Sequence, residues 1–302
     1  MFASANKRII FKFLTLQPFN FLISRMLKYL NLKIPFFFPV KGKLKITMSP
    51  EISFCMQSDG RDSIASRLYL YGPQSFEYDS LRIFSLILNF QSVRTVLDIG
   101  ANTGVYSLVA SAQRPDCKVY AFEPMPGIYS RLSKNVKSNA FSNLHSHNLA
   151  LSDKNGSLEF YYRPAITVPT GGSAAKSDWP DTEKVDVPCV SLDFFHEKEG
   201  LDKIDLIKID TEMTEPVVLK GGSKVIERDK PYIICEVLDE QSSAELCNIL
   251  HPMGFRFFHI VEARLCEKVS IQHDPSYQYA NYLFIHPDRY LEASTGLKTY
   301  LR

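Results

Sequence analysis

The chain has 302 residues, which is long enough for one large domain or two small ones with a sizeable core. This length excludes a mini-protein. Hydrophobic residues make up 45% of the sequence, charged residues 23% and aromatic residues 12%, and this composition excludes a wholly disordered chain. The six cysteines include no C-x-x-C pair and stand mostly among apolar neighbours. We therefore expect reduced thiols in a cytoplasmic protein and neither a disulfide framework nor a zinc site.

The net charge of +2 conceals an uneven distribution, because the first 50 residues carry nine of the 35 basic residues and no acidic one. The same segment has an apolar stripe at helical spacing, made of Phe19, Leu22, Ile23, Met26, Leu27 and Leu30. Two interpretations remain open. The stripe docks on the main domain as a helical cap, or residues 1–40 lie as a basic amphipathic helix on the inner face of a membrane. The longest uncharged stretch, 13–24, is too short to span a bilayer, which takes ~20 residues.

The rest of the chain alternates strands with helices. We expect an accessory region over 1–75, with a short strand near 43–51, followed by one domain over 76–302. Apolar runs predict strands at 94–100, 118–124, 145–151, 157–162, 204–210, 232–238, 255–261 and 281–286. Helical spacing predicts helices at 78–90, 105–113, 128–139, 216–228 and 242–251. This order indicates right-handed βαβ units and an α/β fold with a doubly wound, mostly parallel sheet.

Residues 163–185 interrupt this alternation with a segment rich in Pro, Gly, Ser and Thr. The segment contains Gly171, Gly172, Ser173 and the single tryptophan, Trp179. Long irregular inserts within a compact domain are often functional loops. We expect this one to cover a bound substrate.

The strongest functional motif is VLDIGANTGVYS at 96–107, a buried strand that ends near Asp98 and opens into a loop with Gly100, Asn102 and Gly104. Glycines let the backbone approach a ligand, and the following helix offers unpaired N–H groups to an anion. A dinucleotide site has the pattern G-x-G-x-x-G, whereas this loop is G-x-x-x-G with an acid two residues upstream. An acid suits an ammonium group, so the pattern favours S-adenosylmethionine, which combines a carboxylate, an ammonium group and a ribose.

Glu123 ends the next strand, 23 residues after Gly100. An acid at this position can accept hydrogen bonds from both hydroxyls of a ribose. The alternative is an exposed side chain without a ligand. Because proteins that bind NAD share this acid, Glu123 indicates a nucleoside without identifying it.

Polar residues also mark the strand IDLIKID, in which Lys208 and Asp210 project to one face, with Glu212 just beyond. Transfer of a methyl group to a hydroxyl needs alignment and a base, so these three residues are the catalytic candidates. A structural ion pair between Lys208 and Asp210 is the competing interpretation. A divalent metal held by Asp210, Glu212 and Glu236 is conceivable but not favoured, because acid clusters at a sheet edge are more often solvated.

These motifs together resemble the FkbM-type family of class I methyltransferases. The resemblance covers about 71–286 through YGPQSFEYDSLRIF, VLDIGANTGVYS, AFEPMP, NLALSDKNGSLEFYY, VPCVSLDFF, IDLIKIDTEMTEPVVLKG, PYIICEV and NYLFIH. It implies a Rossmann-like, seven-stranded fold and S-adenosylmethionine as the donor for O-methylation of a sugar or another small molecule.

The resemblance also assigns roles to residues. Asp98, Gly100, Asn102 and Gly104 would hold the methionine end of the donor, Glu123 the ribose, and Ser152 with Asp153 the adenine; Tyr71, Glu77 and Tyr78 would approach the acceptor. One position departs from the family pattern KIDVEG, since this chain reads KIDTEM with Met213 in place of the glycine.

Three other functions remain in competition. The protein could bind S-adenosylmethionine without catalysis, act as a nicotinamide-dependent dehydrogenase, or serve as a membrane-associated assembly protein on an old fold. Nucleic acid is not an expected partner, since residues 51–302 carry 26 basic against 33 acidic residues and no recognised binding module occurs. The expected partner is a small-molecule or glycan acceptor.

Overall fold

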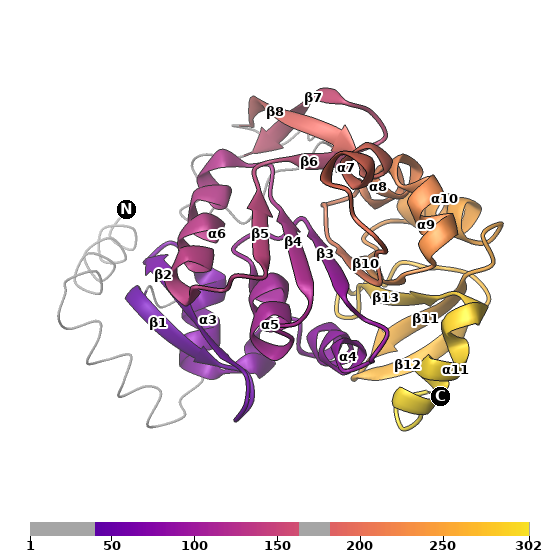
Figure 1. Ribbon diagram of the computed structural model, residues 1–302, viewed down its shortest axis with the longest axis horizontal. Coiled ribbons are helices and arrows are strands. Elements are labelled where there is room, and N and C mark those ends of the chain that lie inside the picture. Colours follow the sequence, from indigo (N-terminus) through magenta and orange to yellow (C-terminus); the bar gives the residue numbers. More distant parts are fainter. Residues whose placement is uncertain (1–39, 163–181, 302) are drawn as a thin grey trace, which may run out of the picture.

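The computed structural model describes residues 40–162 and 182–301 (Figure 1). The predicted helical stripe near the N-terminus, with its cap and membrane interpretations, lies outside the described residues. So does most of the predicted substrate-covering insert, including Gly171, Gly172, Ser173 and Trp179. The insert ends earlier than expected, because residues 183–185 already belong to a strand.

The central sheet has eight strands in the order β12-β11-β13-β10-β9-β3-β4-β5 (Figure 1). Its members are β3 (Thr95–Ile99), β4 (Lys118–Phe122), β5 (Leu144–His147), β9 (Leu206–Ile209), β10 (Tyr232–Glu236), β11 (Arg256–Val261), β12 (Arg264–Lys268) and β13 (Asn281–Ile285). Neighbours from β5 to β10 are parallel, whereas β13 runs antiparallel to β10 and β11. The predicted seven-stranded, mostly parallel sheet is confirmed, and β12 adds an eighth strand by pairing with β11 at the edge.

The strand order reverses between β3 and β9. From β3 the chain proceeds through β4 to β5 on one side, and it then returns to β9 on the other side of β3. In open α/β sheets, ligands bind in the crevice beyond the carboxyl ends of the strands at such a reversal. Asp98 and Lys208, both buried and directly paired in register, bring charge to this point.

Alternate residues of the central strands point into two apolar clusters, one on each face of the sheet. Val96 and Leu206 belong to one cluster, and their neighbours Leu97 and Ile207 to the other. Such continuously apolar strands are expected where helices cover both faces of a parallel sheet.

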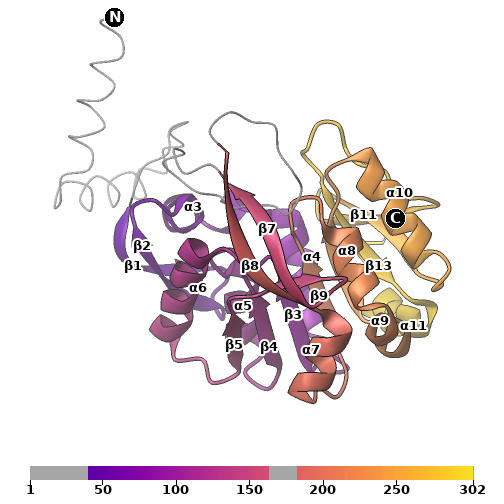
Figure 2. The same ribbon diagram turned by 90° about the horizontal axis from the view of Figure 1, so that it is seen from above.

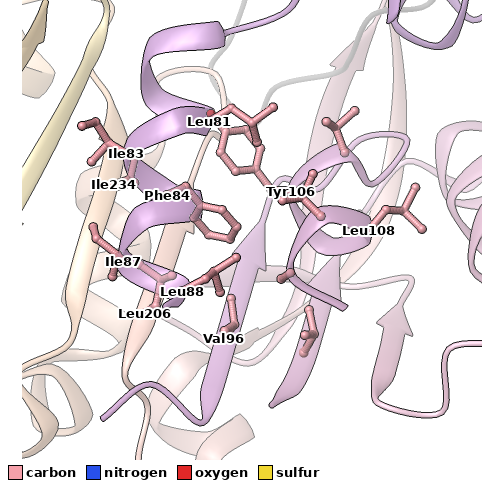
Figure 3. Packing of buried hydrophobic residues seen from close by; sticks show 14 of the residues in the cluster. Leu81, Ile83, Phe84, Ile87, Leu88, Val96, Tyr106, Leu108, Leu206 and Ile234 are labelled. Atoms are coloured by element: carbon pink, nitrogen blue, oxygen red, sulfur yellow. The ribbon is translucent and has the colours of Figure 1, made fainter. Parts of the chain in front are cut away.

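Different helices cover the two faces (Figures 1 and 2). One cluster includes residues of α4 (Tyr78–Leu88), α5 (Val105–Gln113), α6 (Pro126–Asn139) and α11 (Pro287–Gly296). The other includes residues of α7 (Leu192–Glu199), α8 (Glu215–Gly221), α9 (Ser223–Asp229) and α10 (Glu240–Leu250). Figure 3 shows Phe84, Ile87 and Leu88 of α4 beside the strand residues Val96 and Leu206.

The region before α4 shares the first of these clusters. It forms an antiparallel hairpin of β1 (Lys41–Thr47) and β2 (Ser53–Asp59), followed by α3 (Ser63–Tyr71). Two asparagines of α6 bind the outer edge of β2: Asn139 Oδ1 accepts from the backbone N–H of Cys55 and Asn135 Oδ1 from that of Gln57, both at 2.6 Å. The hairpin is thus held against the main body, and the domain boundary near residue 75 stays a prediction.

Two elements differ from their predicted form. The single strand expected at 145–151 is two strands in two sheets, because β6 (Ala150–Ser152) pairs with β8 (Glu183–Ser191), which in turn pairs with β7 (Gly156–Tyr162). Asn148 lies at the break, where its Nδ2 donates to the carbonyls of Glu123 and Pro124 at 2.9 and 2.8 Å. The helix expected at 216–228 is divided into α8 and α9 at Gly222.

Within the two described ranges, no helix is long and apolar enough to cross a membrane. All six cysteines are thiols, and three of them (Cys117, Cys189 and Cys235) are buried.

A buried ion pair fastens the end of the sheet opposite the crevice. Asp205 Oδ2 accepts from the backbone N–H groups of Arg94 and Thr95 at 2.9 and 3.2 Å, while its Oδ1 accepts from Arg289 at 3.0 Å. The side chains of Asp205 and Arg289 are only 4% and 9% exposed. This one carboxylate therefore joins the starts of β3 and β9 to α11.

We expect Asp205→Ala to lower the free energy of unfolding by about 3–5 kcal/mol, because it leaves a buried guanidinium group and two N–H groups without an acceptor. Glu267→Ala, which removes the partly exposed pair between Arg256 and Glu267, should cost about 1 kcal/mol or less. Urea unfolding of both variants measures the difference. Equal losses would contradict the assignment.

Candidate active site

A cavity of about 540 Å³ lies beyond the carboxyl ends of β3, β4, β9 and β10, with β6, β7 and α3 contributing further walls. This volume is typical of a small-molecule site. Ten residues were predicted to bind the donor or to act in catalysis, and nine of them line this cavity: Asp98, Gly100, Asn102, Glu123, Ser152, Asp153, Lys208, Asp210 and Glu212. The tenth, Gly104, is the residue before α5, where a Cβ would lie 2.5 Å from Leu132 Cδ1. Gly104 does not line the cavity. Glycine is favoured there because its φ is +94° and because a side chain would press against Leu132.

Asp98 is bound to the first turn of α5. Its Oδ2 accepts hydrogen bonds from the backbone N–H of Ser107 at 2.9 Å and from the Ser107 hydroxyl. Burial raises the pKa of Asp98 to about 6, although these hydrogen bonds and the nearby charge of Lys208 act in the opposite direction. The side chain thus fixes the loop between β3 and α5 while it also lines the cavity.

The loops after β3 and β9 are in direct contact. Gly100 has a φ of +80°, and a Cβ built on it would lie only 1.7 Å from the carbonyl oxygen of Asp210. The N–H of Asp210 donates to the carbonyl of Ile99 at 2.9 Å. No side chain fits at position 100 unless the two loops separate. The glycine therefore lets the loop after β3 lie directly against the backbone of Asp210.

Both carboxylate oxygens of Glu123 accept hydrogen bonds from the backbone. Oε2 accepts from the N–H of Asn102 at 3.0 Å, and Oε1 accepts from the N–H of Met125 at 2.8 Å. Burial raises the pKa of Glu123 to about 7. Since a carboxylate oxygen has two lone pairs, each of the two oxygens can still accept a hydrogen bond from a hydroxyl group of a ligand.

The part of the cavity beside Glu123 is largely apolar. Its wall is made by Leu149, Leu151, Leu158 and Phe160, with Ser152 and Asp153 at its edge. The Ser152 hydroxyl donates to Asp153 Oδ1 at 3.3 Å, and the Ser152 carbonyl oxygen lies 1.8 Å from where a Cβ on Gly221 would stand. This surface suits a flat, weakly polar ring.

Lys208 is the buried cation of the site, with 1% of its side chain exposed. Its Nζ donates to Asp210 Oδ2 at 3.1 Å and to Asn281 Oδ1 at 3.0 Å, and it lies 3.8 Å from Glu77 Oε2. Burial alone would lower the pKa of Lys208, but the carboxylates of Asp210 and Glu77 outweigh it and hold the pKa well above its ordinary value. The ammonium group therefore stays charged, and the ion pair with Asp210 that was the competing interpretation is present.

The structure adds partners that the sequence did not single out. The Tyr106 hydroxyl donates to Glu77 Oε2 at 2.9 Å, and the Tyr106 ring lies 5.2 Å from Lys208 Nζ. Tyr106 and Asn281 both stand inside matched motifs, but no spacing rule marks them as contacts of Lys208. Glu77 lines the cavity as the resemblance implied, whereas Tyr71 and Tyr78 are not among the lining residues.

Three further carboxyl groups lie around Asp210. Burial together with the charge of the neighbouring Asp210 raises the pKa of Glu236 to about 10. Burial and the charges of Asp210 and Glu215 raise the pKa of Glu212 to about 7. Glu215 accepts from the backbone N–H and hydroxyl of Thr211 at 2.8 and 3.0 Å. In the described part of the chain, no group of three or more side chains has the arrangement needed to bind a metal ion.

Met213, which stands where the family pattern has glycine, has a left-handed backbone conformation. Glu212 and Met213 have φ values of +55° and +77°, a left-handed conformation that glycine adopts without strain. Met213 is 48% exposed, so it gains little from packing. The backbone keeps the conformation that glycine favours although the residue has changed.

We expect Met213→Gly to raise the free energy of unfolding by about 0.5–1 kcal/mol, because it relieves the left-handed strain at the expense of a more flexible unfolded chain. Met213→Ala shortens the side chain but keeps the strain, so its stability should change by less than about 0.5 kcal/mol. Urea unfolding compares the two variants. Identical effects would show that strain at this position is negligible.

The raised pKa of Glu123 predicts a pH dependence of stability. Because the folded state keeps this proton up to a pH of about 7 and the unfolded state loses it near 4.5, the free energy of unfolding should fall as the pH rises through that window. Glu123→Gln cannot titrate, so its decrease should be smaller by roughly 2 kcal/mol. Urea unfolding at pH 5 and 7.5 tests this, and an unchanged pH dependence in the variant would contradict it.

The strand order, with its antiparallel β13, and the cavity at the reversal define a class I methyltransferase fold, as predicted. Comparison with known families is consistent with this class. The model of the FkbM methyltransferase domain matches residues 98–257, slightly more than half of the chain. The chain belongs to the FkbM methyltransferase family.

Named relatives share this domain at modest identity. Methyltransferase sdnD of Sordaria araneosa is 33% identical over 162 residues, which cover 45% of this chain and 62% of that protein. The 31-O-demethyl-FK506 methyltransferase FkbM of Streptomyces tacrolimicus is 28% identical over 190 residues, covering 53% and 72%. The 2-O-methyltransferase NoeI of Sinorhizobium fredii is 24% identical over 165 residues, covering 48% and 64%.

The chain thus spans less than two thirds of sdnD and NoeI. Among solved structures, Methyltransferase FkbM from Methylobacillus flagellatus superposes with a TM-score of 0.46 at 15% identity, covering 73% of this chain and 52% of that one.

Proposed function

We propose that the protein transfers the methyl group of S-adenosylmethionine to a hydroxyl group of a small molecule or sugar. The observation that carries the proposal is one cavity lined both by Glu123 with the loop of Gly100 and by Lys208 with Asp210, where the Gly100 loop and Asp210 are in backbone contact. A nucleoside site and a set of charged groups suited to proton transfer are thus within reach of one bound donor.

The donor end supplies complementary groups for each part of S-adenosylmethionine. Glu123 would accept the ribose hydroxyls with the lone pairs that its two backbone hydrogen bonds leave free. The apolar wall with Phe160 would hold the adenine, with Ser152 and Asp153 at its polar edge. The methionine end would lie along the loop from Asp98 to Gly104, where Asp98 suits the ammonium group and the start of α5 suits the carboxylate.

At the acceptor end, methyl transfer to oxygen requires an aligned hydroxyl and a group that takes its proton. Asp210 and Glu212 line the cavity and are the available carboxyl groups. Lys208 is fully engaged by oxygen atoms of Asp210, Asn281 and Glu77, so it would act as a fixed positive charge that positions Asp210. Several carboxyl groups surround Lys208, whose charge is already committed, so the surroundings of Asp210 favour a hydroxyl compound without negative charge.

The names of relatives support transfer to oxygen. NoeI of Sinorhizobium fredii is named a 2-O-methyltransferase, and the FkbM protein of Streptomyces tacrolimicus is named a 31-O-demethyl-FK506 methyltransferase. We extend that chemistry to this chain, with a sugar hydroxyl as the preferred acceptor.

The first test is calorimetric titration of the purified protein with S-adenosylmethionine, with NADH titrated in parallel. We expect micromolar binding of S-adenosylmethionine, no binding of NADH, and a loss of about 10–100-fold in affinity in Glu123→Ala, because two charge-assisted hydrogen bonds to the ribose disappear. Glu159→Gln, which changes an exposed carboxylate paired with Lys184 away from the cavity, is the matched control and should bind normally.

Three outcomes would contradict the proposal. A folded protein that binds no S-adenosylmethionine has no donor site, and one that binds NADH instead would favour a nicotinamide-dependent dehydrogenase. Binding without methyl transfer to any of a panel of sugars and hydroxylated small molecules would favour a non-catalytic binding protein.

A further inference from the structure

The carboxyl groups of Asp210 and Glu236 form a pair that the proposed function has not used so far. Their strands β9 and β10 are parallel neighbours, with Ile209 opposite Cys235, so the next residues, Asp210 and Glu236, end the two strands side by side. Both carboxyl groups line the cavity, and burial beside the charge of Asp210 raises the pKa of Glu236. Adjacent carboxyl groups, of which one keeps its proton, can share that proton in a hydrogen bond.

The surroundings explain why this proton is retained. Titratable and charged groups from the neighbouring elements surround the pair: Glu77 before α4, Asp98 of β3, Tyr106 of α5, Glu123 after β4, Lys208 of β9, Glu212 before α8, Glu215 at its start, and Cys235 of β10. Lys208 is the one cation among them. A second ionised carboxylate beside Asp210 would therefore add uncompensated negative charge.

We propose that the Asp210 and Glu236 pair holds one shared proton in the empty cavity, releases it when the cationic methyl donor binds, and then takes the proton of the acceptor hydroxyl. The inference rests on the proposed function. Its physical basis is that a positive charge within a few ångströms lowers the pKa of a carboxyl group by about one to three units. The sulfonium group of S-adenosylmethionine brings such a charge into the same cavity.

The transfer step then balances in charge. The bond between sulfur and the methyl carbon breaks, its electron pair stays on sulfur, and a new bond joins the methyl carbon to the acceptor oxygen. The hydroxyl proton passes to a carboxylate oxygen of the pair. Because the sulfonium loses its charge in the same step, the pair regains its affinity for a proton when the acceptor releases one.

The number of protons released on ligand binding tests this inference without a catalytic reaction. Calorimetric titrations at pH 8 in buffers of different ionisation enthalpy give the number of protons exchanged on binding of S-adenosylmethionine and of S-adenosylhomocysteine, which lacks the sulfonium charge. At this pH Glu236 keeps its proton in the free protein, whereas Glu212 is mostly ionised. The α-amino groups of the ligands also titrate near pH 8, so the excess of protons released by the charged ligand is compared between the wild type and Glu236→Gln. We expect this excess to be larger in the wild type by about half a proton or more, the release given by a pKa lowered by about two to three units.

Variants of the carboxyl groups show which of them releases the proton. Glu236→Gln keeps the size of the side chain but cannot share a proton, so the excess released by the charged ligand should fall by about half a proton or more. Glu212→Gln, a matched change at a neighbouring carboxyl group, should retain most of it. Asp210→Asn serves as a second test of the pair should Glu236→Gln fold poorly, as judged by its melting temperature.

The outcomes separate this inference from the proposed function. An excess of released protons that is the same in the wild type, in Glu236→Gln and in Asp210→Asn would overturn the inference while leaving the donor site intact. If the folded protein binds neither ligand, the proposed function fails as well.

Discussion

The buried ammonium group of Lys208 is the constraint on which the arrangement of the site depends. A charge removed from water is tolerated only where partners surround it, and its Nζ finds them in Asp210, Asn281 and Glu77. These partners come from the loop after β9, from β13 and from the residue before α4, which are distant in sequence. The hydroxyl of Tyr106 then fixes Glu77 from α5. One cation therefore sets the positions of four elements around the cavity, and loss of any partner would leave charge uncompensated in the interior.

The second constraint is steric, and it joins the donor end of the cavity to the acceptor end. Gly100 touches the carbonyl of Asp210 so closely that even a methyl group is excluded. The loop that would hold the donor and the strand end that carries the catalytic candidate are thus in contact through their backbones. Because backbone atoms cannot change rotamer, the relative position of the two ends is set more rigidly than side-chain contacts would allow. A reaction that requires an in-line arrangement of donor and acceptor benefits from such a fixed distance.

Much of this could be read from the sequence because the information is local. The strands were predictable from their apolar runs, and the loop at Gly100 from its spacing after a buried strand. The contacts of Tyr106 and Asn281 with Lys208 were not predictable, since they depend on how distant segments pack and no spacing encodes them. The break at Asn148 was missed because the apolar pattern continues across it, although the two halves pair with different strands. The pairing of Glu236 with Asp210 follows from strand register, which only the folded sheet defines.

The division between the family domain and its flanks suggests how chemistry and selectivity are separated in this chain. The match to the family ends at residues 98 and 257, and it includes the donor loop, Glu123, Lys208 and Glu236. Glu77 and Asn281, which complete the shell around Lys208, lie outside it, as does the wall of the cavity made by α3. Under the proposed function, residues within the match would provide the donor site and the proton acceptor, whereas the flanking elements would shape the space left for the acceptor. A change in the flanking elements would then alter which hydroxyl compound fits without removing the groups that hold the donor.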